Sequence, residues 1–157
     1  MKTSKTTTEV EAGLVEPDWA MFIHQGLHCL ILRHGMMGHL CGYVRLPKSS
    51  PHYRTLRNRR KLHVPAFPSR TKKIKGNVRR AYAPDFPDLH VHGGITFAGP
   101  LNFYRADRGF WVGFDCAHYT DKVLFFKTDG EGVYRTFDYV ERECRTLADQ
   151  IVGTITE

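Results

Sequence analysis

The chain has 157 residues, of which 41% are hydrophobic and 12% aromatic, and its formal net charge at pH 7 is +7. This length and composition predict a globular protein that buries its core without the help of disulfides. They exclude a membrane-spanning helix, because no run approaches about 18 apolar residues. A secretory signal is not expected, because the opening stretch MKTSKTTTEVEAG contains no apolar run. We therefore expect a cytoplasmic protein with no membrane partner.

The domain organisation follows from the same features. We expect residues 1–20 to be a disordered lead-in and residues 21–157 to form a single α+β domain. The four cysteines form no C-x-x-C pair, and each lies among apolar residues; they are Cys29, Cys41, Cys116 and Cys144. This pattern predicts buried free thiols and not a structural zinc site.

The positive charge is concentrated in one segment. Residues 54–80 hold eleven of the 23 lysines and arginines and no aspartate or glutamate, and the rest of the chain has more acidic than basic residues. Such a segment attracts the phosphates of nucleic acid or of a small nucleotide. The alternative is a solvated loop that repels itself and has no ligand.

The first half of the chain predicts a β-hairpin followed by a long loop. Residues 27–33 (LHCLILR) and 38–46 (GHLCGYVRL) are β-rich and are joined by HGMMG, whose glycines suit a turn. Pro47 ends the second strand because proline cannot donate to a sheet ladder. From there to about residue 87 we expect a loop that includes the basic insertion 54–80, with room for a short helix in 68–82.

The second half predicts three more strands and a helix. The strands are 89–97, broken at Gly93 and Gly94, then 109–115 and 122–127, with a turn at 129–132. A helix should follow, capped by Thr136 and ending near Gly153. Its apolar face consists of Phe137, Val140, Cys144, Leu147, Ala148 and Ile151. The expected fold class is α+β: an antiparallel sheet packed by one long C-terminal helix, with a long basic loop insertion.

The glycine pair in LHVHGGITF raises the first question of function. Two adjacent glycines in a strand context cost stability, unless the backbone needs positive φ or a ligand must approach closely. One interpretation is a ligand-binding bend, in which Gly93, Gly94 and Thr96 hold an anion and His92 stands at its edge. The other interpretation is a β-bulge without a ligand.

The histidines and aspartates nearby suggest acid–base or metal chemistry. His90 and His92 would share one face of a strand, and Asp115, His118 and Asp121 follow soon after. These residues would serve either a metal-bound water or a metal-free pair, His92 and His118, with a carboxylate that orients the imidazole.

We favour the metal-free pair, because His90 and Cys116 would complete only an irregular set of metal ligands. The sequence does not indicate which cofactor, if any, the protein uses. Tyr43, Arg45 and His52, around the loop that starts at Pro47, are candidates for the same ligand cleft. By contrast, Asp138, Glu141 and Glu143 are interpreted as a solvated helix face, and His24, His28, His34 and His39 as structural or surface residues.

The order of these motifs resembles a family of small proteins from bacteriophage and prophage genomes. The resemblance covers residues 28–152 apart from 54–80. Its motifs are CGYV-x-x-P (41–47), PHY (51–53), VHGG-x-TF (91–97), W-x-GFD-x-AH-x-x-D (111–121), Y-x-x-x-x-YV-x-x-E (134–143) and LA-x-Q-I (147–151). It implies that His92, Asp115, His118 and Asp121 carry the function and that His90 does not. It implies a phage setting, hence the cytoplasm of the host cell, and no particular activity.

Three functions are consistent with this sequence. The first is a small phage accessory hydrolase that cleaves a phosphate-containing nucleotide, by analogy with anti-defence proteins that remove signalling nucleotides. There His92 and His118 would be acid and base, with Asp115 or Asp121 as the orienting carboxylate and Arg45 neutralising charge. The second is a non-catalytic, oligomeric sponge for the same ligand. The third is nucleic-acid binding through residues 54–80.

Overall fold

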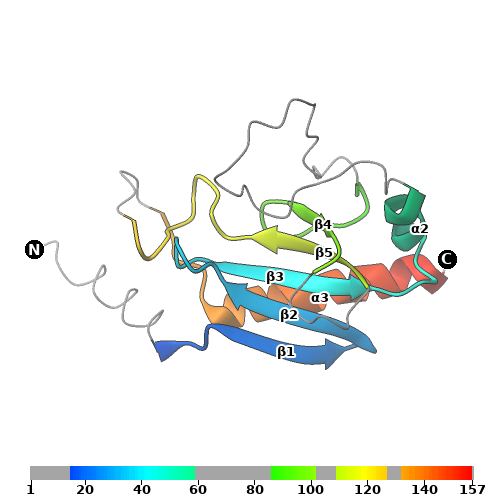
Figure 1. Ribbon diagram of the computed structural model, residues 1–157, viewed down its shortest axis with the longest axis horizontal. Coiled ribbons are helices and arrows are strands. Elements are labelled where there is room, and N and C mark those ends of the chain that lie inside the picture. Colours follow the sequence, from blue (N-terminus) through cyan, green and yellow to red (C-terminus); the bar gives the residue numbers. More distant parts are fainter. Residues whose placement is uncertain (1–14, 59–85, 102–108, 127–131, 157) are drawn as a thin grey trace, which may run out of the picture.

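The computed structural model describes residues 15–58, 86–101, 109–126 and 132–156, and it shows a five-stranded antiparallel sheet with a long helix across one face (Figure 1). The elements are β1 (Trp19–His24), β2 (Leu27–Arg33), β3 (Leu40–Leu46), α2 (Pro51–Asn58), β4 (Phe97–Gly99), β5 (Phe110–Asp115) and α3 (Phe137–Thr156). The strand order is β1-β2-β3-β5-β4. The expected α+β class, antiparallel sheet and C-terminal helix are confirmed. Most of the basic insertion, the helix expected in 68–82 and most of the turn at 129–132 lie outside the described residues.

The β2–β3 hairpin lies at the centre of the sheet. The sequence predicted this hairpin, and the structure adds its antiparallel register, with Cys29 opposite Val44 and Arg33 opposite Leu40. β5 pairs with the other side of β3, with Cys41 opposite Asp115. β3 is therefore paired on both sides, and its first residues are level with the end of β5.

The sheet begins earlier than expected. Trp19 and Ala20 already belong to β1, which pairs with β2. Glu16 accepts hydrogen bonds from the Tyr134 hydroxyl at 2.6 Å and from the Phe137 N–H, at the start of α3, at 2.8 Å. Because these contacts fix the chain from residue 16 onward, the lead-in expected over 1–20 is too long at its C-terminal end.

Helix α3 follows its predicted face but extends further. Thr136 caps it, since its side-chain oxygen accepts the Tyr139 N–H at 3.3 Å. The pair Glu141–Arg145 forms an i, i+4 ion pair of 2.6 Å. Gly153 does not end the helix, which continues to Thr156. Among the described residues no helix is long and apolar enough to cross a membrane.

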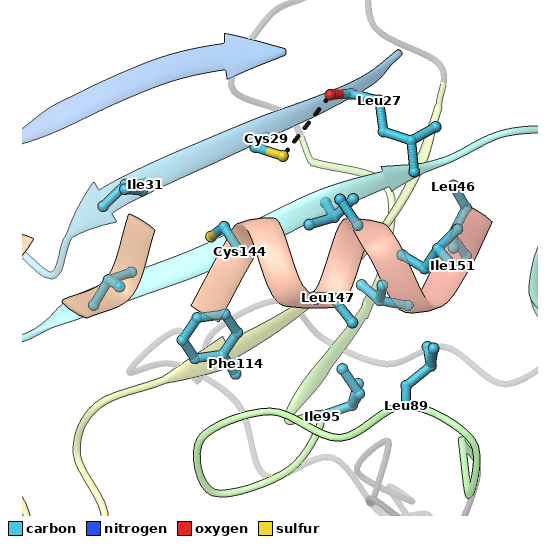
Figure 2. Packing of buried hydrophobic residues seen from close by; sticks show 14 of the residues in the cluster. Leu27, Cys29, Ile31, Leu46, Leu89, Ile95, Phe114, Cys144, Leu147 and Ile151 are labelled. Atoms are coloured by element: carbon cyan, nitrogen blue, oxygen red, sulfur yellow. Dashed lines mark hydrogen bonds between the residues drawn. The ribbon is translucent and has the colours of Figure 1, made fainter. Parts of the chain in front are cut away.

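The main core lies between the sheet and α3 (Figure 2). Cys144, Leu147 and Ile151 of α3 are fully buried against β2, β3 and β5. All four cysteines are buried free thiols, as predicted. On the opposite face of the sheet a smaller cluster buries Leu30, Cys41, Tyr43 and Trp111.

Three predicted elements differ from the structure. Of the strand expected at 89–97, only Phe97 is in a strand, β4. Residues 122–126 form no strand: 124–126 are bends, Phe125 and Phe126 are about half exposed, and an isolated bridge joins Asp121 to Val133. Helix α2 occupies Pro51–Asn58, where a loop was expected.

Candidate functional site

The predicted histidines and aspartates meet where the loop 90–96, the segment 115–121 and the first turns of α3 come together. The segment after β5 (yellow in Figure 1) leaves the sheet at the end opposite to α2. The site is therefore built from two irregular segments placed against a helix.

Side chains of α3 hold the loop in place. The Gln150 side chain accepts the His90 N–H at 2.6 Å and donates to the His90 carbonyl at 2.8 Å. The Glu143 carboxylate accepts the His92 N–H at 2.8 Å. These bonds take the place of sheet pairing, so His90 and His92 do not share a strand face. The His90 side chain is exposed, whereas His92 lies inside the site.

The Asp121 carboxylate is the centre of the site. Its side chain is fully buried and accepts three hydrogen bonds: from His92 Nε2 at 2.7 Å, from the His118 N–H at 3.0 Å and from Arg135 Nε at 2.9 Å. Burial alone would raise the pKa of Asp121, but the bonds from His92, Arg135 and the His118 N–H outweigh burial and lower that pKa below its ordinary value. Asp121 is thus held as a carboxylate.

Both ring nitrogens of His92 are engaged. Nε2 faces Asp121, and Nδ1 lies 2.9 Å from the Tyr139 hydroxyl. The Tyr139 ring is itself covered by the Arg135 guanidinium, 5.0 Å from its centroid. His92 is 10% exposed, so its ring is fixed in orientation and largely shielded from solvent.

His118 is the less restrained of the two imidazoles. Its Nε2 is buried and has no hydrogen-bond partner among the described residues, and it lies 3.8 Å from Asp115 Oδ1. Gly93 makes room for it: a Cβ built there would lie 1.8 Å from His118 Nε2, and Gly93 has φ +65. The glycine therefore serves the close approach of an imidazole to the loop backbone.

Asp115 stands at the more open edge. Its Oδ2 accepts the Thr96 hydroxyl at 2.7 Å, and its Oδ1 accepts the Ala117 N–H at 3.1 Å. The side chains of Asp115 and His118 are each 31% exposed. A small molecule can therefore reach this edge.

Two of the three residues expected to hold an anion, Gly94 and Thr96, use their donors within the protein. The Gly94 N–H donates to the Val91 carbonyl at 2.9 Å, and the Thr96 N–H donates to the Gly113 carbonyl at 2.9 Å. The Thr96 hydroxyl is bonded to Asp115. Because these donors are already used, Gly94 and Thr96 shape the loop and position Asp115.

The other three predicted ligand residues lie elsewhere. Tyr43 shares a sheet face with Asp115 but is buried in the outer cluster, edge-on to Phe97. His52 is buried beside Phe86. Arg45 is four residues along β3 from the position opposite Asp115, about 13 Å of strand. Together with His28, Lys48 and Tyr53 it lines a separate cavity of about 580 Å³.

Sequence reasoning missed three residues near the site. Arg135 was not considered, and Glu143 was assigned to a solvated face. Tyr139 and Glu143 are one helical turn apart, and both stand in the Y-x-x-x-x-YV-x-x-E motif, which was a usable signal. His39, which was interpreted as structural or surface, is buried and stacks on His34 at 4.8 Å. Burial, and to a smaller extent the neighbouring His34, lowers the pKa of His39 to about 4.

The donor set of the site is suited to a cation. One nitrogen each of His92 and His118 and one oxygen of Asp121 lie within 4.8 Å of one another. The hydrogen-bonded side chains of the site include three carboxylates, of Asp115, Asp121 and Glu143, against one guanidinium, of Arg135. With neutral imidazoles the site is therefore negative, which favours a cation over a bare anion.

The comparisons with known proteins found no match to this chain among protein-family models, curated proteins or solved structures.

Proposed function

We propose that the protein is a His/Asp-dependent hydrolase that acts on a phosphate-containing nucleotide. The observation that carries the proposal is the convergence of His92, His118, Asp115 and Asp121 from two separate segments into one partly open site. Hydrolysis joins the oxygen of water to phosphorus, breaks the bond from phosphorus to the leaving oxygen, and passes one proton from water to that oxygen. Imidazoles and carboxylates are the side chains that assist such a proton transfer or hold an ion that does so.

The substrate class is inferred from sequence and charge. The basic segment 54–80 attracts phosphates. A host signalling nucleotide is the substrate that the motif resemblance described in the sequence analysis would imply, by analogy alone. The described part of this segment is on α2, beside the cavity lined by His28, Arg45 and Lys48. The cations Arg45 and Lys48 would raise the local concentration of a nucleotide, while the reaction takes place at the His/Asp site.

The test is incubation with a panel of cyclic dinucleotides, cyclic trinucleotides and ADP-ribose derivatives, followed by heat denaturation and mass spectrometry. We expect one compound to be converted, either to a ring-opened product heavier by one water or to two fragments whose masses sum to that of the substrate plus one water. His118→Asn should abolish the conversion, and His90→Asn, which changes an exposed histidine of the same loop, should retain it.

Each other outcome points to a different function. A compound that is depleted and then released intact on heating would replace the hydrolase with a sponge. A panel left untouched would remove the small-nucleotide substrate and favour nucleic-acid binding through 54–80. In that case, binding should weaken steeply with salt.

A further inference from the structure

We infer that His92, His118 and Asp121 form a binding site for a single divalent transition-metal ion, with zinc the best match. The inference deepens the proposed function because the ion would be the agent that activates water, but the site itself is argued from geometry alone. Two imidazoles and one carboxylate are a donor set found in zinc hydrolases, and three protein ligands leave coordination positions open for water or substrate.

The spacing of the donor atoms fits such an ion. In a tetrahedral zinc site with bonds of about 2.0–2.1 Å, neighbouring donor atoms are roughly 3.3 Å apart. Here His92 Nε2 and Asp121 Oδ2 are 2.7 Å apart, and all three donor atoms lie within 4.8 Å. Small side-chain rotations would therefore bring the three donors into coordination.

The unpartnered nitrogen of His118 is the second observation. Nε2 is buried and has no hydrogen-bond partner among the residues the structure describes, which is costly for a polar atom. Because no described residue offers this nitrogen a hydrogen bond, a bound ion would supply its missing partner. This geometry speaks against the metal-free acid–base pair expected from the sequence.

The surroundings supply the outer support that metal ligands need. Tyr139 is hydrogen-bonded to Nδ1 of His92, as an orienting partner of a metal-binding imidazole should be. To bind an ion at Nε2, neutral His92 must carry its proton on Nδ1, where the Tyr139 oxygen would accept it. Arg135 and the His118 N–H orient Asp121 in the same way.

Asp115 lies beside the three proposed ligands and is not one of them. Asp115 Oδ1 lies 3.8 Å from His118 Nε2, on the partly exposed edge of the site. Thr96 and the Ala117 N–H fix its orientation. Asp115 would therefore face the open coordination positions, where it can orient the attacking water.

The test measures metal binding without any substrate. The untagged full chain is stripped with a chelator and titrated with ZnCl2 by calorimetry, and with CoCl2 while the visible absorption of Co²⁺ is recorded. We expect one ion per chain. His118→Ala should weaken the affinity at least 100-fold, while His90→Ala, the matched control, should change it less than twofold. Tyr139→Phe should weaken it about 10-fold or more, and it keeps the inference testable if His118→Ala misfolds.

The metal inference and the hydrolase can fail separately. If the wild type takes up no stoichiometric zinc, or if His118→Ala and His90→Ala bind it equally, the metal site is refuted. Nucleotide hydrolysis that persists in chelator-stripped protein would refute the role of the ion in activating water, while supporting the hydrolase. Tight zinc binding without hydrolysis of any nucleotide would support the metal site and overturn the proposed substrate.

Discussion

Replacing Gly93 with alanine should be the most informative single change near the site. Gly93 has φ +65, so an alanine there would adopt a left-handed backbone at a cost of about 1–2 kcal/mol. The added Cβ would also lie 1.8 Å from His118 Nε2, roughly half of an ordinary contact distance. Relieving that overlap by moving the imidazole or the loop should cost about 1–3 kcal/mol more.

Gly26→Ala is the matched control for this prediction. Gly26 has φ +76, but a Cβ there would meet nothing within 4 Å. It therefore carries the backbone strain without the overlap. We expect the free energy of unfolding to fall by about 1–2 kcal/mol in Gly26→Ala and by about 2–5 kcal/mol in Gly93→Ala.

Urea unfolding followed by tryptophan fluorescence measures both variants, since Trp111 is 2% exposed in the sheet and should report the loss of the core. The imidazole nitrogen resonances of His118 should shift in Gly93→Ala and stay in place in Gly26→Ala. Equal destabilisation of the two variants, with unshifted His118 signals, would refute the close approach of His118 to the loop.

Three further predictions concern stability. Burial, and to a smaller extent the nearby His34, lowers the pKa of His39 from 6.5 to about 4. Between these two pH values the unfolded chain therefore binds a proton that the folded chain does not bind. The free energy of unfolding should have its full value above pH 6.5 and should fall by about 3 kcal/mol between pH 6.5 and pH 4. Urea titrations at several pH values should show this loss in the wild type and not in His39→Gln. Gly153→Ala should stabilise α3 by about 1 kcal/mol, measured as a higher urea midpoint, because its Cβ meets open space. Glu16→Ala should cost about 2 kcal/mol in the same assay, because it removes an acceptor of the buried Arg33 guanidinium and of the α3 N-terminus.

These three have distinct contrary outcomes. The same acid-induced loss in His39→Gln as in the wild type would assign that loss to other groups, foremost Asp121, whose pKa the fold lowers. A lower urea midpoint in Gly153→Ala would mean that this turn of α3 faces a contact. Unchanged stability in Glu16→Ala would show that the chain before β1 does not support the helix.

The elements that could be predicted from the sequence are those whose pattern is local. The β2–β3 hairpin has strand-rich runs around glycines, and α3 repeats apolar residues at helical spacing. The strand β5 is a short apolar run before Asp115. In each case the burial that stabilises the element is encoded within the element itself.

The elements that were missed depend on distant partners. The loop that carries His92 has a strand-like sequence, but Glu143 and Gln150 on α3 bind its backbone, and no local signal in LHVHGGITF announces them. β1 (WAMFIH) is apolar without alternation, so it did not stand out from the lead-in. The apolar run KVLFFK has no strand partner in the described part of the chain.

The candidate site was predictable in its members and not in its geometry. His92, Asp115, His118 and Asp121 were selected by residue type and spacing. Their roles depended on the actual fold, because it encloses Nε2 of His118 against Gly93 and binds both nitrogens of His92. Arg45 was wrongly assigned to the same ligand cleft, because its distance from Asp115 along β3 cannot be judged before the strand pairing is known.

The four buried thiols can be used to measure local opening of the fold without any introduced label site. They lie on β2, on β3, just after β5 and on α3, and burial raises the pKa of Cys29 to about 11 and of Cys41 to about 12. Because only an exposed thiolate reacts, a maleimide should modify the native protein only during transient openings. Mass spectrometry of each labelled cysteine would then rank β2, β3, the end of β5 and α3 by the rate at which each opens. A single cysteine introduced on the exposed surface would be labelled first, with the native thiols left in place.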